Sequence, residues 1–537
     1  MAQRFRASRR SFLKQSVVFG SLAGLGGLSR RVQAEAPAIV TAESRRPVVS
    51  HGLQIGDVLE DRAIVWSRAD RAACLLVEWS REEDFSRAIV VRGPHALDVS
   101  GYTARVDLTG LPAGADVFVR LTFQDLDAQE AASEPVVGRF RTAPRHGRDV
   151  TFLWGADTAG QGWGIDLAFG GMKIYETMRR IQPDFFIHSG DNIYADGIMT
   201  ESVALPNGGT WHNAYLDVVP AKLKVAETLE EFRGNYLYNL MDENVRRFNA
   251  EVPQIWQWDD HEVTNNWSDS KDLSGDPLYS EKRVQTLVAR AGRAFLEHAP
   301  MRWFSQEESE RVYRHIPYGP DLDVFVVDMR SYRGPNSFNR QEVVSAETDF
   351  LGPVQVEWLK RKLKESRATW KVIAADMPIG LLVGDGVDAQ GRPRFEAIAN
   401  GNGPALGREL EMADLLRYLK RHDVANVVWI TGDVHYCAAH HYDPSRAQFQ
   451  DFDPFWEFVA GPLHAGTFGP NALDDTFGPR VVFQKAPPAG QSNLSPVAGL
   501  QFFGQIDIDH GSRDLTVLLK DLSGATVFSQ RLRPTQR

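Results

Sequence analysis

Two patterns of apolar and polar residues divide the chain. Between residues 47 and 144, short alternating segments such as AIVWSRA, CLLVEWS and DVFVRLTF are separated by Gly and Pro. Alternation with a period of two is typical of half-buried strands, and strands at this spacing indicate an all-β sandwich. We therefore predict a β-sandwich over residues 45–145.

The rest of the chain, residues 148–537, alternates apolar strand-like runs with segments of helical periodicity. Helical periodicity is found in residues 167–181, 355–365 and 407–421. This alternation is typical of an α/β domain. Residues 500–532 return to a period of two, which predicts a β-meander at one edge of the sheet.

Six predicted strands of this domain end on an aspartate. They are residues 151–157, 185–191, 254–259, 324–328, 371–376 and 427–433. One Asp after a strand is usually a turn former or a helix cap, but six in one domain, several beside His, Asn or Tyr, are harder to explain as turns. Because the carboxyl ends of parallel strands share one edge of a sheet, these side chains are expected to converge there. Oxygen ligands mixed with imidazole predict bound metal.

The N-terminus resembles a twin-arginine export signal. Residues 8–14 read SRRSFLK, a weakly apolar stretch follows, and residues 32–34 offer a small-residue cleavage site. We assign residues 1–34 to this signal. Its partner would be the twin-arginine translocase, and the mature protein would be periplasmic or secreted. Elsewhere no apolar run reaches ~18 residues, so no transmembrane span is predicted.

Length, charge and cysteine content limit the number of domains and the classes of protein to which the chain can belong. A chain of 537 residues exceeds the roughly 250–300 residues at which one core stops growing, which favours two domains. The net charge of −10 argues against a nucleic-acid partner held by phosphate contacts. Two cysteines exclude a disulfide framework as the main source of stability.

The predicted ligand types suit a site with two metal ions, which the hydrolysis of a phosphate ester could use. This hydrolysis needs a deprotonated water for attack and positive charge beside the phosphate oxygens, and two metal ions roughly 3.5–4 Å apart can supply both. A carboxylate that bridges the two ions would hold them together, and Asp191 is the candidate. Tyr194 could add a phenolate to a hard trivalent ion.

Three strings carry a family resemblance: GDNIY at 190–194, WDDHE at 258–262 and GDVHY at 432–436. With the export signal and WKVIAAD at 370–376, they make the chain similar to the PhoD-like alkaline phosphatases of the calcineurin-like metallophosphoesterase superfamily. The resemblance covers nearly the whole chain after the signal. It implies an α/β fold in which a fibronectin-III-like sandwich precedes a four-layer αββα metallophosphoesterase domain. The implied activity is hydrolysis of phosphate esters by a metal-bound water.

The resemblance also implies roles for single residues. The metal ligands would be Asp157, Asp191, Tyr194, Asp260, Asp433 and His435. The catalytic residues would be His261, which protonates the leaving oxygen or orients the phosphate, and Asn192, which contacts substrate or holds its loop. Weaker candidates for substrate contact are Asn265, Arg330 and His464. For Arg330 a structural salt bridge is the alternative, and for His464 it is a loop position that does not reach the pocket.

The chain departs from the family pattern at Asp157, where the family often has a cysteine. Two or more metal ions are expected, with iron and calcium as candidates. Because an oxygen replaces a thiolate, the iron and calcium pair is in doubt and harder or other divalent ions are favoured, so the metal identity stays open. Asp376 is either a further ligand or a loop residue before Pro378.

Two alternatives to an alkaline phosphatase remain. One is a phosphodiesterase or phospholipase D-like enzyme, so the substrate is either a small phosphate ester or a phospholipid. The other is a catalytically silent extracellular binding protein stabilised by metal, against which the intact His261 and His435 weigh. The sequence leaves open the physiological ester, the metal pair, the oligomeric state and the pH optimum.

Overall fold

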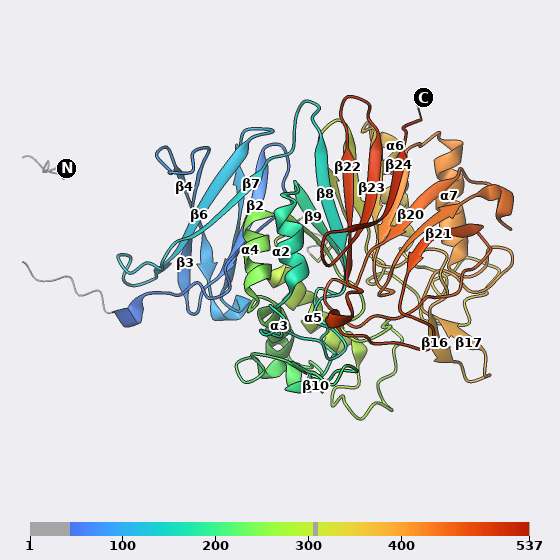
Figure 1. The fold of residues 1–537 in the computed structure, drawn as a ribbon, viewed down its shortest axis with the longest axis horizontal. Coiled ribbons are helices and arrows are strands. Elements are labelled where there is room, and N and C mark those ends of the chain that lie inside the picture. The colour runs from blue at the N-terminus through green and yellow to red at the C-terminus, as the bar shows by residue number, and fades with distance from the viewer. Residues whose placement is uncertain (1–42, 304–309, 536–537) are drawn as a thin grey trace, which may run out of the picture. The chain divides into compact units, whose positions relative to one another are not determined.

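The N-terminal strands form the predicted β-sandwich (Figure 1). The structure, a computed structural model, describes residues 43–303 and 310–535, so the predicted signal at residues 1–34 lies outside the described residues. One layer contains β1 (Leu53–Gly56), β2 (Arg62–Arg68) and β5 (Thr103–Thr109). The other contains, in spatial order, β4 (Ile89–Ala96), β3 (Ala73–Ser80), β6 (Asp116–Asp125) and β7 (Val136–Arg141). Apolar side chains such as Val65, Leu75 and Val119 fill the space between the layers.

The first of these layers continues into the α/β region as one sheet. β1 pairs in parallel with β12 (Gln254–Gln257), and the strand order is β24-β23-β22-β8-β9-β12-β1-β2-β5. The other strands are β8 (Val150–Gly155), β9 (Phe185–Ser189), β22 (Phe502–Ile508), β23 (Leu515–Asp521) and β24 (Thr526–Leu532). β8, β9 and β12 are parallel, and β22 to β24 form the predicted meander, antiparallel to β8.

A second large sheet faces the α/β part of the first. Its order is β13 (Arg314–Pro317), β14 (Leu322–Val326), β15 (Trp370–Ala374), β18 (Val427–Thr431), β20 (Phe455–Val459), β19 (Cys437–Tyr442) and β21 (Pro479–Lys485). Its four central strands are parallel. Side chains from the inner faces of both sheets, including Phe152, Ile187, Val324 and Val372, form one core.

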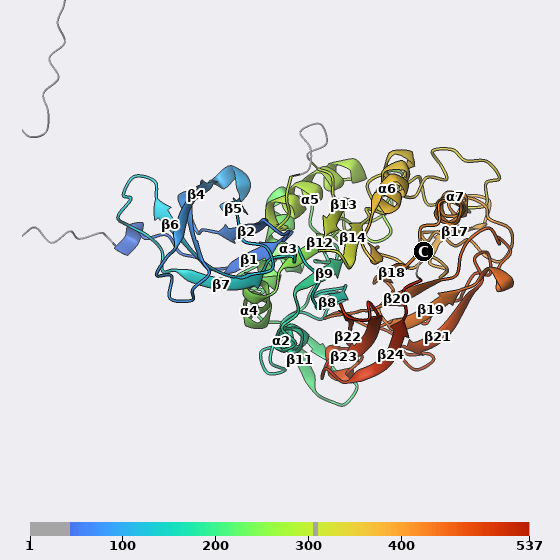
Figure 2. The same ribbon diagram turned by 90° about the horizontal axis from the view of Figure 1, so that it is seen from above.

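Helices cover the outer faces of the two sheets, which gives the predicted four-layer αββα arrangement (Figure 2). The α-helices in the described part of the chain are α2 (Lys173–Arg180), α3 (Leu229–Asn239), α4 (Glu243–Glu251), α5 (Val284–His298), α6 (Pro353–Glu365) and α7 (Glu409–Arg421). Successive residues of a strand face opposite sides, so Leu153 of β8 belongs to an outer core that it shares with Phe248 of α4. On the second sheet, Ile373 shares an outer core with Leu416 of α7.

Shorter elements lie in the connections. The 3-10 helices are η1 (Glu43–Arg45), η2 (Asp98–Ser100), η3 (Pro220–Leu223), η4 (Pro444–Arg446) and η5 (Pro496–Ala498). Two small hairpins pair β10 (Ser202–Ala204) with β11 (Thr210–His212) and β16 (Gly384–Val387) with β17 (Pro393–Phe395). Within the described ranges, no helix is both long and apolar enough to span a bilayer.

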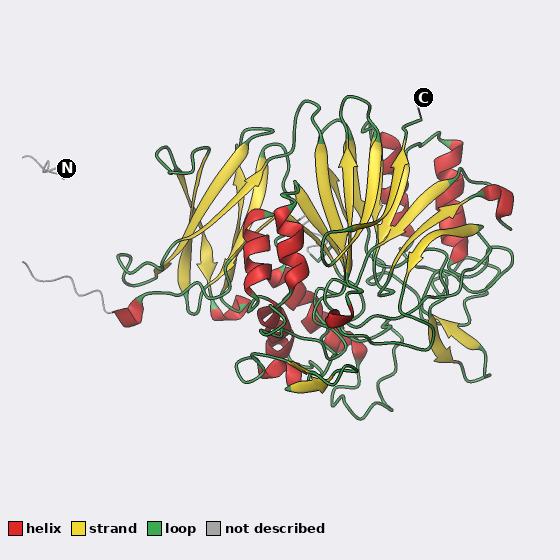
Figure 3. Ribbon diagram, in the orientation of Figure 1, coloured by secondary structure: helices red, strands yellow, loops and turns green. Residues whose placement is uncertain are grey.

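All six strands predicted to precede an aspartate are present. Each ends two residues before its aspartate, so the six aspartates lie in the loops that follow β8, β9, β12, β14, β15 and β18. Long irregular segments gather beyond one end of the strands (Figure 3). The six aspartates therefore belong to the loops at this end of the sheets, and the strands fix where those loops begin.

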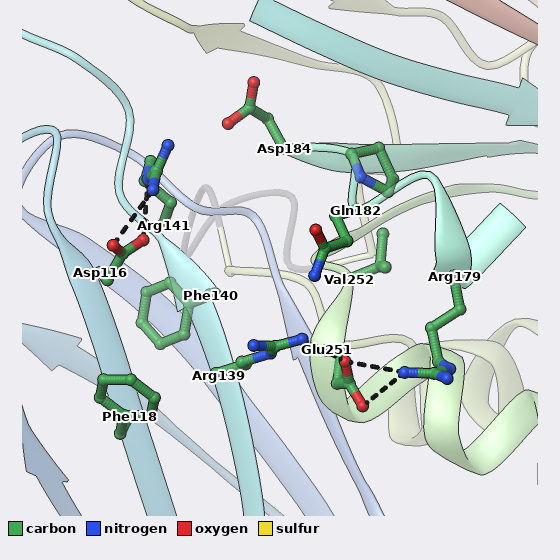
Figure 4. A pocket seen from close by; sticks show the side chains of 11 residues that line it. Asp116, Phe118, Arg139, Phe140, Arg141, Arg179, Gln182, Asp184, Glu251 and Val252 are labelled. Carbon is green, nitrogen blue, oxygen red and sulfur yellow. Dashed lines mark hydrogen bonds and ion pairs between the residues drawn. The ribbon is translucent and has the colours of Figure 1, made fainter. Parts of the chain in front are cut away.

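A cavity of about 340 Å³ lies between the sandwich and the α/β region (Figure 4). Five of its charged side chains pair with one another: Arg141 binds Asp116, while Arg139 of β7 and Arg179 of α2 both bind Glu251. Its α/β residues precede β9 and β12, whereas the aspartate loops follow these strands. The cavity is thus held by ion pairs at the end of the sheet opposite to the aspartates.

A buried ion pair joins the sandwich to both large sheets. Asp57, which follows β1, accepts hydrogen bonds from Nε and Nη2 of Arg314 at 3.1 and 2.9 Å, and neither side chain is exposed. Arg314 belongs to β13 and also donates to the carbonyl oxygen of Trp256 in β12. A buried charge that loses its partner is strongly destabilising.

We expect Asp57→Asn to lower the free energy of unfolding by about 3 kcal/mol or more, because it leaves the Arg314 charge buried and uncompensated. Asn keeps the side-chain volume and tolerates the positive φ of 42° at this position. The measurement is urea denaturation followed by tryptophan fluorescence. Asp116→Asn is the control, because its pair with Arg141 is 46% and 60% exposed and should cost at most about 1 kcal/mol. Equal losses in both variants would contradict the prediction.

Candidate metal centre

Loops after four strands bring seven acidic and imidazole side chains together. They form three overlapping groups: Asp157, Asp191 and His435; Asp191, Asp260 and His261; and Asp259, Asp260 and Asp433. Within each group the possible ligand atoms lie within 4.8 Å of one another. Asp191 and Asp260 each belong to two groups, so both lie where a bridging carboxylate is needed. Of the six aspartates that the sequence predicted to converge, four are in these groups, whereas Asp328 and Asp376 are not.

The backbone at these positions is strained. Asp157, Asp191, Asp433 and His435 have φ values of 71°, 52°, 66° and 61°. A positive φ is uncommon outside glycine, although Asp adopts it more easily than most residues. Strained residues of this kind cluster at functional sites because the surrounding structure holds them there. The sharp turns aim the side chains into the space beyond the strand ends.

Several buried carboxylate oxygens lack a hydrogen-bond partner. Both oxygens of Asp157, one of Asp259 and one of Asp260 have none among the described residues, and Asp157 is fully buried. Burial, and then Asp259, raises the pKa of Asp157 well above its usual range, while burial and then Asp260 do the same for the pKa of Asp191. A buried carboxylate without a partner is costly, and a cation removes that cost. The donor set therefore fits bound metal ions.

His435 is held in the tautomer that suits metal binding. Its Nδ1 donates to the carbonyl oxygen of Gly466 at 2.5 Å, so Nε2 keeps a free lone pair. Nε2 lies 2.9 Å from the Tyr194 hydroxyl and 3.8 Å from Oδ1 of Asp157. Burial raises the pKa of Tyr194, so without a cation this residue stays a phenol that donates to His435. Nitrogen, phenol and carboxylate groups thus meet at one point.

His261 is paired with an acid that the sequence did not single out. Its Nδ1 lies 2.7 Å from Oδ1 of Asp196, and its backbone N–H donates to Asp191 at 3.1 Å. Its ring contacts the Tyr194 ring at a tilt of 34°, with centroids 4.4 Å apart. Burial alone would lower the pKa of His261, but Asp196 and Asp260 outweigh it and raise the pKa to about 10. Its side chain is 15% exposed, so this imidazole lies at the edge of the cluster, where solvent can reach it.

Asn192 and Asn265 lie on either side of this cluster. The amide of Asn192 donates to the carbonyl oxygen of Gln257 at 2.6 Å and to Glu262 at 3.0 Å, which places it in the buried layer behind Asp191. Asn265 is exposed, and its backbone N–H donates to Asp196, the partner of His261. Of the two, Asn265 is the one that solvent can reach.

Arg330 and His464 are both buried. Arg330 pairs with Asp259, with 2.5 Å between Nε and Oδ1, and with Glu396, so the structural salt bridge that the sequence left as an alternative is present. His464 uses Nε2 to donate to the carbonyl oxygen of Gly164 at 2.8 Å, and its backbone N–H donates to the backbone carbonyl oxygen of Asp157 at 2.9 Å. Arg330 underlies the carboxylates, and His464 supports the Asp157 loop.

Four further acidic residues belong to the site. Asp196 and Glu262 were not singled out. Glu262 ends the WDDHE string that contains His261, and Asp196 lies just after the GDNIY string that contains Asp191. Asp259 was predicted as one of the six strand-end aspartates, but without a role of its own. Asp376, left between ligand and loop residue, is buried with one oxygen lacking a hydrogen-bond partner among the described residues, and that oxygen lies 3.6 Å from Nε of Arg330.

Comparison with known proteins places this geometry in a family. Residues 152–519 match the family model of the PhoD-like phosphatases, and residues 33–144 match the model of their N-terminal domain. The chain is 26% identical over 451 residues to alkaline phosphatase D of Bacillus subtilis (strain 168), which covers 79% of this chain and 71% of the relative.

Two solved structures share the fold. The structure of PhoD has a TM-score of 0.64 at 20% identity and covers 91% of this chain and 92% of its own. The purple acid phosphatase PPD1 from yellow lupin (Lupinus luteus) seeds has a TM-score of 0.53 at 14% identity and covers 91% and 74%. With the family model matched over most of its length, the chain belongs to the PhoD-like phosphatase family and is a metal-dependent phosphoester hydrolase.

Proposed function

We propose that this protein is an exported phosphoesterase of the alkaline phosphatase D type, which hydrolyses small phosphate esters outside the cytoplasm. The observation that carries the proposal is the set of carboxylates shared around Asp191, next to the His261 and Asp196 pair. The similarity to alkaline phosphatase D supports the substrate class. The SRRSFLK string in residues 8–14 supports export by the twin-arginine translocase.

Two metal positions follow from the donor atoms. Asp157, Asp191, Tyr194 and His435 would hold one ion, which suits iron or another transition metal because the set includes imidazole and phenol. Asp191 would also bind the second ion together with Asp260, which lies in one group with it, and Asp433, which lies in another group with Asp260. These three carboxylates offer only oxygen, as calcium prefers. When bound, the two ions would supply an activated water and neutralise the phosphate oxygens.

The chain's own residues handle the leaving group. Asp196 accepts the Nδ1 hydrogen of His261, which fixes the ring and favours its protonated form. His261 can then donate the proton on Nε2 to the leaving oxygen as the bond from phosphorus to that oxygen breaks. Burial of the surrounding acids strengthens these interactions, since electrostatic effects are larger where water is excluded.

Chelation should abolish hydrolysis of both a phosphomonoester and a phosphodiester, and single added metals should restore it. It should also lower the melting temperature, because the buried carboxylates then repel one another. Asp191→Ala should behave like the chelated protein, whereas Asp166→Ala, which removes a buried Asp that binds only backbone N–H groups, should keep its metals. Turnover that survives complete metal removal would refute the proposed site.

His261→Ala should lower kcat by about 10²–10⁴-fold, because a positioned proton donor contributes roughly that factor. Metal content, measured by plasma mass spectrometry, should stay at the unsubstituted level. His212→Ala is the matched control, since His212 is exposed in the β10 and β11 hairpin. An unchanged kcat in His261→Ala would remove this residue from the reaction.

Replacing Arg9 and Arg10 together by Lys should block export, because the twin-arginine pathway reads this pair. The measurement is phosphoesterase activity in the cytoplasmic and extracytoplasmic fractions of cells that express the full chain. Replacing Arg30 and Arg31 by Lys is the control, since these arginines lie outside the SRRSFLK string. Activity outside the cytoplasm in the Arg9 and Arg10 variant would contradict the export route.

A further inference from the structure

One buried carboxylate joins two of the loops that carry the proposed ligands. Glu262 is fully buried and its two oxygens accept four hydrogen bonds. The donors are the backbone N–H groups of Asp191, Asn192 and Asp259 at 3.2, 2.6 and 2.7 Å, and the side-chain amide of Asn192 at 3.0 Å. Three of these donors are in the loop after β9, and one is in the loop after β12.

These N–H groups have lost their partners in the sheet. β9 and β12 pair in parallel up to Ser189 and Gln257, and the loops turn away directly afterwards. Buried backbone N–H groups need acceptors, and Glu262 provides them for both loops at once. The loops are also in close contact, because a Cβ added at Gly190 would lie 2.5 Å from the Cβ of Asp259. Two chain segments that carry proposed ligands are thus fixed to one side chain.

We propose that Glu262 is a positioning residue that sets the spacing between Asp191 and Asp260, and so the spacing of the two metal positions. This inference rests on the ligand assignment proposed above. The four hydrogen bonds of Glu262 join it to N–H groups and not to the proposed ligand oxygens. One of these N–H groups belongs to the backbone of Asp191 and another to that of Asp259, the residue directly before Asp260. Supporting contacts of this kind typically change metal affinity or activity by about 10–100-fold when they are removed.

The same contacts give Asn192 a place in this unit. Its amide spans Glu262 and the carbonyl oxygen of Gln257, the last residue of β12. Its backbone carbonyl accepts from Asn239 of α3 at 2.6 Å. Asn192 therefore ties the loop of the bridging aspartate to β12 and α3, and acts through Asp191.

The test is Glu262→Gln, which keeps the size of the side chain but replaces one acceptor oxygen with an NH₂ group that faces N–H donors. We expect kcat to fall about 10–100-fold with little change in KM, and metal affinity to fall by a similar factor. In metal-free protein, amide hydrogen exchange should quicken in residues 189–193 and 257–262. This last readout is independent of activity and of metal.

Glu411→Gln is the matched control. Glu411 of α7 also accepts three backbone N–H groups, those of Phe350, Leu351 and Gly352, but it lies in the layer outside the second sheet. The Glu411→Gln protein should lose stability, while its kcat, KM and metal affinity stay unchanged. If Glu262→Gln does not fold, Asn192→Ala, which removes one of the four donors, should show the same pattern at smaller size.

Two outcomes would overturn the inference. One is a Glu262→Gln protein that resembles Glu411→Gln, with stability lost but metal affinity and kcat kept. The other is a defect in KM alone, which would indicate substrate contact. Failure of the unsubstituted protein to bind metal would instead refute the ligand assignment, so the two failures are distinguishable.

Discussion

The metal centre depends on β9 and β12 running side by side in parallel. Their register, Gln257 opposite Ser189, makes both strands end at the same level, so the loops that follow leave the sheet together. A hairpin arrangement would send these loops to opposite ends. With the loops adjacent, one carboxylate can satisfy both backbones, and the aspartates they carry face a common space.

That arrangement places several carboxylates close together in a buried site, where their negative charges are unfavourable. The structure compensates these charges in two ways. Arg330, fully buried, compensates Asp259 with a permanent positive charge. Asp157 has no such partner in the described chain, and its oxygens are left for an ion. Binding of the ions and formation of the final loop geometry are therefore expected to be coupled, because each stabilises the other.

The strands and the types of ligand residue can be recognised in the sequence more clearly than which strands and which side chains pair with one another. Runs such as residues 324–327 are easy to recognise because they are apolar throughout, and the aspartate that follows each run is visible. Pairings between distant segments are not: nothing near Gly56 indicates that β1 extends the β12 edge. For the same reason Asp196 could be read but not matched with His261, and His464 could not be assigned to Gly164. Side-chain direction is set by tertiary packing, which a local pattern does not contain.

The C-terminal meander also determines when the site can form. β8, whose loop carries Asp157, has β22 as its antiparallel neighbour, and β22 begins at Phe502. A ribosome that makes this chain from its N-terminal side synthesises β22 after every loop that carries a proposed ligand. The first sheet therefore stays open beside Asp157 until β22 has been made, and we expect metal loading to follow the pairing of β22 with β8.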